Sequence, residues 1–201
     1  MSHLERIHDS TPTVYERNAQ GWDKSRSRHL VEASWLDRFT RLLPPGCAIL
    51  DVGCGAGEPI SRYLIEKGFA LTGIDASPAM IGICQSRFPD AEWMVMDMRN
   101  LSLDRTFGGI VAWDSFFHLN PSEQRSVLPQ FMRCLQSGGA LLITVGHEAS
   151  EVLGTVENEE VYHSSLSPKE YKGILNTGGL QDVEIVFQDP NCGHRSVLLA
   201  Q

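Results

Sequence analysis

Short apolar runs alternate with longer amphipathic segments through most of this 201-residue chain. The apolar runs cover residues 47–52, 69–74, 91–96, 109–113 and 139–145. Several of them lack strict alternation of apolar and polar residues, which is typical of parallel strands buried on both faces. Segments with the apolar spacing of helices lie between them, at 58–67, 77–87 and 121–136. This order predicts a doubly wound α/β fold, in which a mostly parallel sheet has helices on both faces.

The two ends of the chain extend this pattern. Further strands are expected at 182–187 and 195–199, which gives a seven-stranded sheet, and this last pair is consistent with one antiparallel strand at its edge. Near the start, helices are expected at 12–24 and 28–43. The apolar face of the second consists of Val31, Trp35, Phe39 and Leu42. Because both helices precede the first strand, they predict an N-terminal helical lid.

Three helix starts use the same pair of residue types, an Ser or Asn followed by Pro. The side-chain oxygen can accept hydrogen bonds from free backbone amides, and Pro is well tolerated at the first helical position. The three pairs are Ser77-Pro78, Asn120-Pro121 and Ser167-Pro168.

Composition narrows the class of protein. The formal charge is −8, from 25 acidic and 17 basic residues, and an acidic surface repels the phosphates of nucleic acid. A local basic run at 24–29 is interpreted as a solvated helix face. No apolar stretch has the length of a signal peptide core or a membrane span. The five cysteines contain no Cys-x-x-Cys pair that would indicate a metal site, so we expect reduced thiols in a cytoplasmic protein.

Aspartates follow four consecutive predicted strands: Asp51, Asp75, Asp97 and Asp114. In open parallel sheets, ligands bind beyond the carboxyl ends of the strands, where these four side chains are expected to lie. Four carboxylates side by side repel one another, which is unfavourable unless a ligand binds to them. One or two of them can instead serve as helix caps. The carboxylate of Asp75 can accept hydrogen bonds from two ribose hydroxyls, and that of Asp97 suits an exocyclic amine.

The first of these aspartates opens a glycine-rich loop between a strand and a helix. Glycines at 53, 55 and 57 allow a tight turn and let a ligand approach the backbone. The dinucleotide fingerprint needs its third glycine at position 58. Here that position is Glu58, whose charge would repel a pyrophosphate. The loop therefore indicates a nucleotide-like ligand and its spacing argues against a dinucleotide, although a nicotinamide-dependent oxidoreductase stays an alternative.

At this point the chain resembles the class I S-adenosylmethionine-dependent methyltransferases. The resemblance extends in order over residues 47–145, and its most specific part is the glycine loop with the acidic residue that follows it. It rests on five segments: 49–57, 73–77, 96–98, 113–119 and 137–142. It implies a single domain over 1–201, with a helical cap at 1–43, a cofactor-binding core at 47–145, and an acceptor-side segment with the last strands at 146–201.

The resemblance also implies roles for individual residues. S-adenosylmethionine would be the cofactor and S-adenosylhomocysteine the product. Gly53, Cys54 and Gly55 would approach the methionine portion, and Trp113 and Asp114 would flank the sulfonium. Adenosine would contact Asp75, Ala76, Met80, Asp97 and Met98, while Tyr15 and Trp22 would belong to a helix that closes over it. The cofactor-binding set is completed by Asp51 and Gly57.

The sequence marks the residues that would bind the methyl acceptor less specifically than those that would bind the cofactor. His118 is the first candidate for a general base, because it lies four residues beyond Asp114. His147, Tyr162 and His163 are further candidates for the acceptor pocket, in a segment at 147–166. The expected reaction is in-line methyl transfer to an O, N or S nucleophile of a small molecule, by a monomer or a homodimer. A non-catalytic S-adenosylmethionine-binding protein or partner subunit stays a second alternative.

Overall fold

Successive side chains of the central strands point to opposite faces of one sheet, and both faces are apolar. In the computed structural model, which describes residues 1–201, Leu50 and Val52 of one strand belong to one core cluster. Ile49 of the same strand belongs to the cluster on the other face. This period-2 alternation buries the strands on both sides, as the sequence predicted.

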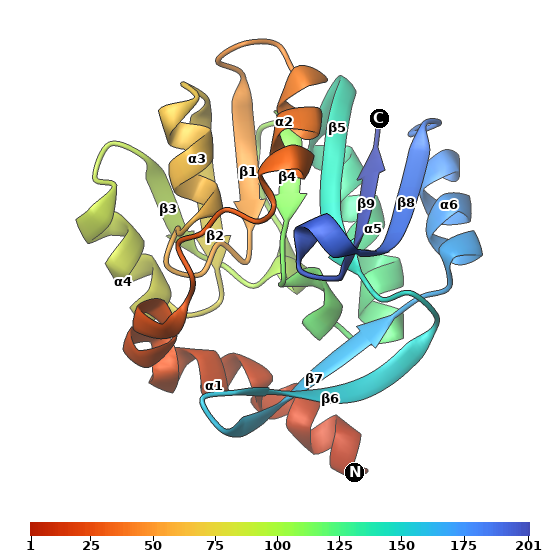
Figure 1. The fold of residues 1–201 in the computed structure, drawn as a ribbon. Helices are drawn as coiled ribbons and strands as arrows, with labels where there is room; N and C mark the ends of the chain where they lie inside the picture. The colour runs from red at the N-terminus through yellow and green to blue at the C-terminus, as the bar shows by residue number, and fades with distance from the viewer.

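The main sheet has seven strands, and its carboxyl edge will position the site (Figure 1). In spatial order they are β3 (Glu92–Val95), β2 (Ala70–Asp75), β1 (Ala48–Val52), β4 (Phe107–Ala112), β5 (Leu135–Val145), β9 (Arg195–Ala200) and β8 (Val183–Asp189). Only β9 runs against the others, and it lies between β5 and the edge strand β8. The predicted doubly wound, mostly parallel sheet is therefore confirmed.

Helices cover both faces of this sheet. The helices α2 (Ala33–Arg41), α3 (Ile60–Glu66) and α4 (Pro78–Arg87) contribute to one core cluster. The helices α5 (Pro121–Cys134) and α6 (Pro168–Thr177) contribute to the other. Ser77, Asn120 and Ser167 each accept hydrogen bonds from backbone amides of the following turn, as predicted for the three pairs with Pro.

The N-terminal helices differ from their predicted bounds. Helix α1 covers His3–Ser25 and begins nine residues before the expected 12, because Ser2 and Glu5 form a reciprocal capping box. Helix α2 is shorter than the expected 28–43 and starts at Ala33. Trp35 and Phe39 are buried as predicted. Leu42 is 36% exposed instead, and Leu36 takes its place in the core.

The segment after β5 forms a separate hairpin. Strands β6 (Ser150–Val156) and β7 (Glu159–Ser165) pair only with each other. Figure 1 shows this hairpin below the carboxyl edge of the main sheet, alongside α1. The hairpin and α1 therefore cover the edge at which the parallel strands end. Three short 3-10 turns complete the chain: η1 (Met98–Asn100), η2 (Phe116–His118) and η3 (Pro190–Cys192).

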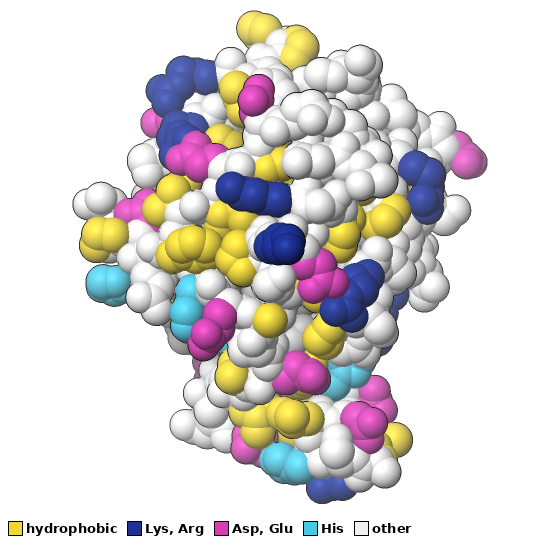
Figure 2. All heavy atoms as spheres, turned by 90° about the vertical axis from the view of Figure 1, so that its right-hand side faces the viewer, with side chains coloured by type: hydrophobic (Ala, Val, Ile, Leu, Met, Phe, Trp, Pro, Cys, Tyr) yellow, Lys and Arg dark blue, Asp and Glu magenta, His cyan; other side chains and the backbone are white.

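The surface shows how the charges are distributed. Figure 2 shows the right-hand face of Figure 1, in which Lys and Arg side chains are scattered among acidic and apolar ones and do not form a continuous basic surface. This agrees with the formal charge of −8. No helix combines the length and apolar character needed to cross a bilayer.

Candidate functional site

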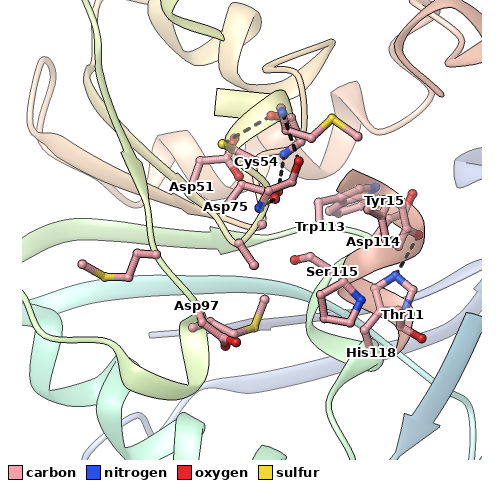
Figure 3. Close-up of a pocket in the computed structure, with 18 of the residues that line it drawn as sticks. Thr11, Tyr15, Asp51, Cys54, Asp75, Asp97, Trp113, Asp114, Ser115 and His118 are labelled. Carbon is pink, nitrogen blue, oxygen red and sulfur yellow. Dashed lines mark hydrogen bonds between the residues drawn. The ribbon is translucent and has the colours of Figure 1, made fainter. Parts of the chain in front are cut away.

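A cavity lined by 25 residues and partly open to solvent lies at the carboxyl ends of β1, β2 and β4. Asp51, Asp75 and Trp113 lie at or next to the ends of these strands, and Tyr15 of α1 reaches the cavity from the other side (Figure 3). Trp22 of α1 also lines the cavity. A doubly wound sheet binds ligands at this position, because the strand order reverses where β1 and β4 lie side by side.

Almost every residue that was predicted to bind the cofactor lines this cavity. They are Tyr15, Trp22, Asp51, Gly53, Cys54, Gly55, Asp75, Ala76, Met80, Asp97, Met98, Trp113 and Asp114. Gly57 does not line it, and its cofactor-binding role stays a prediction. A Cβ atom on Gly57 would lie 2.9 Å from the ring of Phe88 and 3.3 Å from Cys84 Sγ. The third glycine of the loop is thus required for packing against α4.

The backbone amides of the glycine loop are already hydrogen-bonded within the protein. Gly53 and Cys54 both donate to the carbonyl oxygen of Ile74, at 2.8 and 3.0 Å. Gly55 donates to the carboxylate of Asp75 at 2.9 Å. The loop therefore offers a ligand a close-fitting backbone surface, while these three amides are not available to it.

Asp51 lies at the base of the loop and is 3% exposed. Its carboxylate accepts a 2.5 Å hydrogen bond from Ser61. Burial raises the pKa of Asp51 to about 7, and the Ser61 hydroxyl only partly opposes this effect. The side chain can consequently be neutral or ionised near physiological pH, and a cation in the cavity would favour its ionised form.

Two carboxylates lie further along the cavity. Asp75 accepts hydrogen bonds from the amides of Gly55 and Ser77, and burial raises its pKa. Burial also acts to raise the pKa of Asp97, but hydrogen bonds from Arg99 outweigh burial and hold that pKa below its usual value. Asp97 is therefore an anion with a cationic partner at the cavity wall.

Asp114 is held in an unusual backbone conformation. Its φ of 50° lies in the left-handed region, which non-glycine residues seldom adopt. Its amide donates to Thr144 Oγ1 at 2.8 Å. Its carboxylate accepts from Arg195 at 2.7–3.0 Å and from Arg26 at 3.4 Å. Strand β5, strand β9 and the segment after α1 thus converge on this one side chain.

His118 has a defined tautomer. Its Nδ1 lies 2.8 Å from the carbonyl oxygen of Tyr162, which can only accept, so Nδ1 carries the hydrogen. Its Nε2 lies 2.9 Å from the hydroxyl of Tyr15 and accepts that hydrogen bond (Figure 3). Burial lowers the pKa of His118 to about 4. The ring is therefore neutral at physiological pH, with its basic nitrogen directed at α1.

Helix α1 is attached on both sides of the cavity. On the α4 side, the carboxylate of Glu16 accepts from the Ser77 hydroxyl and the Ala79 amide, and Asp23 forms an ion pair with Arg87. On the hairpin side, the bonds join Thr11 to the Tyr162 amide, and Arg17 and Asn18 to Glu159. Helix α1, held over the cavity by these contacts, is the predicted lid.

The predicted acceptor-side residues do not all reach the cavity. His118 lines it. His163 lies behind His118, with ring centroids 4.9 Å apart, and does not line the cavity. The side chain of Tyr162 turns away and donates to Glu151 at 2.6 Å. The side chain of His147 is 55% exposed beside Glu148 and does not line the cavity, so its role in the acceptor pocket stays a prediction.

Sequence patterns missed several residues that the fold brings to the cavity. His8, Thr11 and Pro12 belong to the early part of α1, which the Ser2–Glu5 capping box could have revealed. Arg26 belongs to the basic run that was interpreted as a solvated face, and that interpretation is wrong for this residue. The other lining residues, which were not predicted as site residues, are Glu58, Ile60, Ser77, Met96, Arg99, Ser115 and Leu119.

Two buried N–H groups in the cavity lining have no hydrogen-bond partner. They are Nε of Arg26 and the indole Nε1 of Trp113. Trp113 is 4% exposed as a whole. Buried donors in proteins are nearly always paired, so an unpaired donor in a cavity wall is a feature that a ligand can explain.

Comparisons with known proteins agree with this architecture. A family model described as a methyltransferase domain matches residues 49–139. The putative methyltransferase YqeM of Bacillus subtilis (strain 168) is 33% identical over 140 residues, which are 66% of this chain and 55% of that protein. A demethylmenaquinone methyltransferase of Thermotoga maritima is 36% identical over 98 residues, 47% of this chain and 42% of that protein. The chain spans about half the length of these curated relatives.

A solved structure matches over the whole chain. The DhpI–SAH complex has a TM-score of 0.74 and 18% sequence identity, with coverage of 100% of this chain and 98% of that one. At 18% sequence identity, this match shows that the two chains share a fold. Residues 49–139 thus match the methyltransferase domain model, and the whole chain shares the Rossmann-like fold of this solved structure. The family resemblance drawn from the sequence is confirmed.

Proposed function

We propose that this chain is an S-adenosylmethionine-dependent methyltransferase that transfers the methyl group, in line, to an O, N or S nucleophile of a small molecule. The observation that carries the proposal is the convergence on one cavity of the glycine loop, Asp75, Asp97 and the Tyr15–His118 pair. The first three features suit a nucleoside with a charged side chain, and the last suits an acceptor that must lose a proton.

The residues of the cavity fit this cofactor. Gly55 packs against the ring of Trp22, and a Cβ atom there would lie 3.1 Å from that ring, so glycine lets the lid helix approach the loop closely. Asp51 would face the ammonium of the methionine portion, and Asp75 the ribose hydroxyls. Asp97 and Met98 would contact adenine, because a carboxylate accepts from an exocyclic amine and a thioether packs against a ring.

A nicotinamide cofactor fits less well. Glu58 lines the cavity at the position where a dinucleotide loop has its third glycine, and it is 8% exposed. Arg62 pairs with its carboxylate. A pyrophosphate at this turn would meet a buried acidic side chain where it needs hydrogen-bond donors.

The enclosure by α1 favours a small acceptor. Helix α1 is attached on both sides of the cavity, so a polymer could not lie across it without breaking these contacts. The acidic balance of 25 to 17 charged residues also disfavours nucleic acid. The acceptor end contains Tyr15, His118, Asp114 and Arg26, which allows polar acceptors and does not define one compound.

The proton of the acceptor can pass through Tyr15. When bound, S-adenosylmethionine would supply an electrophilic methyl group on a sulfonium, whose leaving group is a neutral thioether. As the acceptor releases its proton to the Tyr15 oxygen, Tyr15 donates its own hydrogen to Nε2 of His118, so the phenol is never left as an anion. Burial raises the pKa of Tyr15 well above its usual value, which disfavours the phenolate and favours this paired transfer. Positioning the nucleophile in line with the methyl group supplies most of the remaining rate enhancement.

We also propose a cytoplasmic location and a monomer or homodimer. All five cysteines are free thiols, and four of them are buried. Thiols persist in reducing compartments, which supports this location.

The proposal is tested by incubating the protein with methyl-labelled S-adenosylmethionine and a cell extract, followed by mass spectrometry of labelled small molecules. We expect a labelled product that the Asp75→Asn variant does not form. Binding of the methyl donor without any labelled product would favour a non-catalytic binding protein. Absence of both binding and product would refute the proposed function.

A further inference from the structure

One fully buried polar side chain near the cavity has no part in the chemistry described above. Gln124 of α5 is 0% exposed and does not line the cavity. An amide in an apolar core is unfavourable unless its hydrogen bonds are satisfied. The amide nitrogen of Gln124 lies 3.0 Å from the carbonyl oxygens of both Leu119 and Ser164, and 2.9 Å from the Ser164 hydroxyl. Gln124 therefore joins the residue that follows η2 to strand β7.

Tyr171 of α6 fixes the orientation of this amide. The Tyr171 hydroxyl donates to Oε1 of Gln124 at 2.6 Å. Burial raises the pKa of Tyr171, so the hydroxyl keeps the hydrogen that it donates. If the amide were reversed, its oxygen would face two carbonyl oxygens, none of which can donate. The N–H groups of Gln124 consequently point to Leu119 and Ser164.

The two segments that Gln124 joins are the ones that hold His118. Leu119 directly follows His118, and Ser164 lies two residues after Tyr162 in β7. The carbonyl oxygen of Tyr162 accepts the hydrogen of His118 Nδ1 at 2.8 Å. The hydrogen bonds of Gln124 therefore act directly beside the one that sets the tautomer of His118.

Only side chains connect η2 to the hairpin. No backbone–backbone hydrogen bond joins residues 116–119 to residues 159–165, and the ladder partners of β7 are all in β6. Two direct bonds join the segments, from His118 to Tyr162 and from the Ser164 hydroxyl to the Leu119 carbonyl at 2.6 Å. Gln124 adds a bridge from α5, a helix that packs on the main sheet. It thereby fixes the hairpin and η2 to the same rigid element.

We propose that Gln124 is a positioning residue for methyl transfer and that it acts through His118. By holding η2 against β7, it keeps Nδ1 of His118 on the Tyr162 carbonyl and leaves Nε2 able to accept from Tyr15 (Figure 3). A ring with its hydrogen on Nε2 could not accept the hydrogen of Tyr15. This inference rests on the proposed function, in which His118 is the final acceptor of the proton.

The first test follows the ring nitrogens of His118 by nitrogen NMR of isotopically labelled full chain at neutral pH. The signals of His118 are identified by their absence from His118→Gln. In the wild-type protein they should show one neutral tautomer, with hydrogen on Nδ1. Gln124→Met keeps the approximate shape of the side chain and removes its hydrogen bonds. In this variant the ratio of the Nδ1–H form to the Nε2–H form should fall about fivefold or more.

The second test asks whether Gln124 acts through His118. Gln124→Met should slow label transfer from methyl-labelled S-adenosylmethionine to the small molecules of a cell extract by about 10- to 100-fold, as expected for a misplaced catalytic group. Calorimetric affinity for S-adenosylhomocysteine should change by less than about threefold. In a His118→Ala background, the same replacement should slow transfer by less than about twofold, because residues that act as a unit have non-additive effects.

Two further variants serve as a graded test and a matched control. Tyr171→Phe keeps the amide and removes the hydroxyl that orients it. It should change the tautomer ratio and the transfer rate in the same direction as Gln124→Met but less, and it provides a second test if Gln124→Met does not fold. Gln130→Met makes the same replacement in α5, where the side chain contacts only the carbonyls of Arg99 and Ser126. It should change neither quantity.

The outcomes separate this inference from the proposed function. A tautomer ratio that both Gln124→Met and Tyr171→Phe leave unchanged would overturn the inference, as would equal slowing by Gln124→Met with and without His118. Loss of S-adenosylhomocysteine affinity in step with the transfer rate would mean that Gln124 only maintains the cavity, which also overturns it. These results leave the proposed function intact. A wild-type protein that forms no labelled product would refute the proposed function and the catalytic part of this inference, whatever the nitrogen signals show.

Discussion

The hydroxyl of Tyr15 lies 2.9 Å from Nε2 of His118, although the two residues are 103 positions apart in the sequence. Tyr15 belongs to the lid helix α1, and His118 ends the turn η2 beyond β4. The carbonyl of Tyr162 fixes the opposite nitrogen of the ring. The candidate base is therefore oriented by the hairpin and covered by the lid, so closure of α1 and alignment of the base occur together.

Replacement of His118 by Ala should slow methyl transfer about 100-fold or more, because the paired proton transfer loses its final acceptor. Tyr15→Phe should have a similar effect on turnover. Affinity for S-adenosylhomocysteine, measured by calorimetry, should change by less than about threefold in both variants. Unchanged turnover of the true acceptor by His118→Ala would remove His118 as the base.

The same histidine should make stability depend on pH. Its pKa is lowered to about 4 in the folded protein, from 6.5 in the unfolded chain. Between these values the unfolded chain binds more protons, so the free energy of unfolding should fall as pH falls from 6.5 to 4, by about 2 kcal/mol. Urea denaturation at pH 7.5 and 4.5 measures this change. His118→Gln should lose less stability than wild type over this interval, and equal losses would contradict the assignment.

Asp51 predicts a pH dependence of binding. Its pKa is raised to about 7 by burial, and the ligand ammonium would favour its ionised form. Ligand binding should then release protons near neutrality, and affinity for S-adenosylhomocysteine should rise by up to about tenfold from pH 6 to pH 8. Calorimetry in two buffers of different ionisation enthalpy measures the proton release. Asp51→Asn should flatten this profile, and a flat profile in the wild type would count against the role of Asp51.

Two glycines should respond oppositely to replacement by Ala. Gly53 has a φ of 68°, and a Cβ atom there would lie 2.4 Å from the Cβ of Ser115. Gly53→Ala should cost about 2–4 kcal/mol of stability, from backbone strain and overpacking. Gly82 lies within α4 and has open space around its Cβ position, so Gly82→Ala should stabilise by up to about 1 kcal/mol. Thermal or urea denaturation distinguishes them, and equal effects would contradict the loop geometry.

Local patterns were sufficient for the features that depend on neighbours in the sequence. The strand ends at Asp51 and Asp75, the glycine turn between strand and helix, and the helix start at Ser77 all follow from short-range rules. They bring the residues of the proposed cofactor site to one cavity, because the carboxyl ends of parallel strands meet at one edge. The position of β9 between β5 and β8 depends on strand pairing, which single-sequence patterns do not define.

The features that were missed depend on contacts between distant residues. Arg195 reaches Asp114 across 81 positions, and although the strand-end pattern marks Asp114, no local motif marks Arg195 as its partner. Arg26 resembles its exposed neighbours in sequence, and only the return of the chain beside β4 buries its Nε. His147 had the residue type of an acceptor-side group, but the chain places it at an exposed turn before β6. The residue types of the site were thus predictable from the sequence, whereas the directions in which these side chains point were not.

The central claim is that this cavity binds S-adenosylmethionine. Calorimetric titration of the wild-type protein with S-adenosylhomocysteine, and separately with oxidised nicotinamide adenine dinucleotide, tests it most directly. We predict one-to-one binding of S-adenosylhomocysteine with a dissociation constant in the micromolar range, about −8 kcal/mol, and no measurable binding of the dinucleotide. Binding of the dinucleotide without binding of S-adenosylhomocysteine would contradict the account.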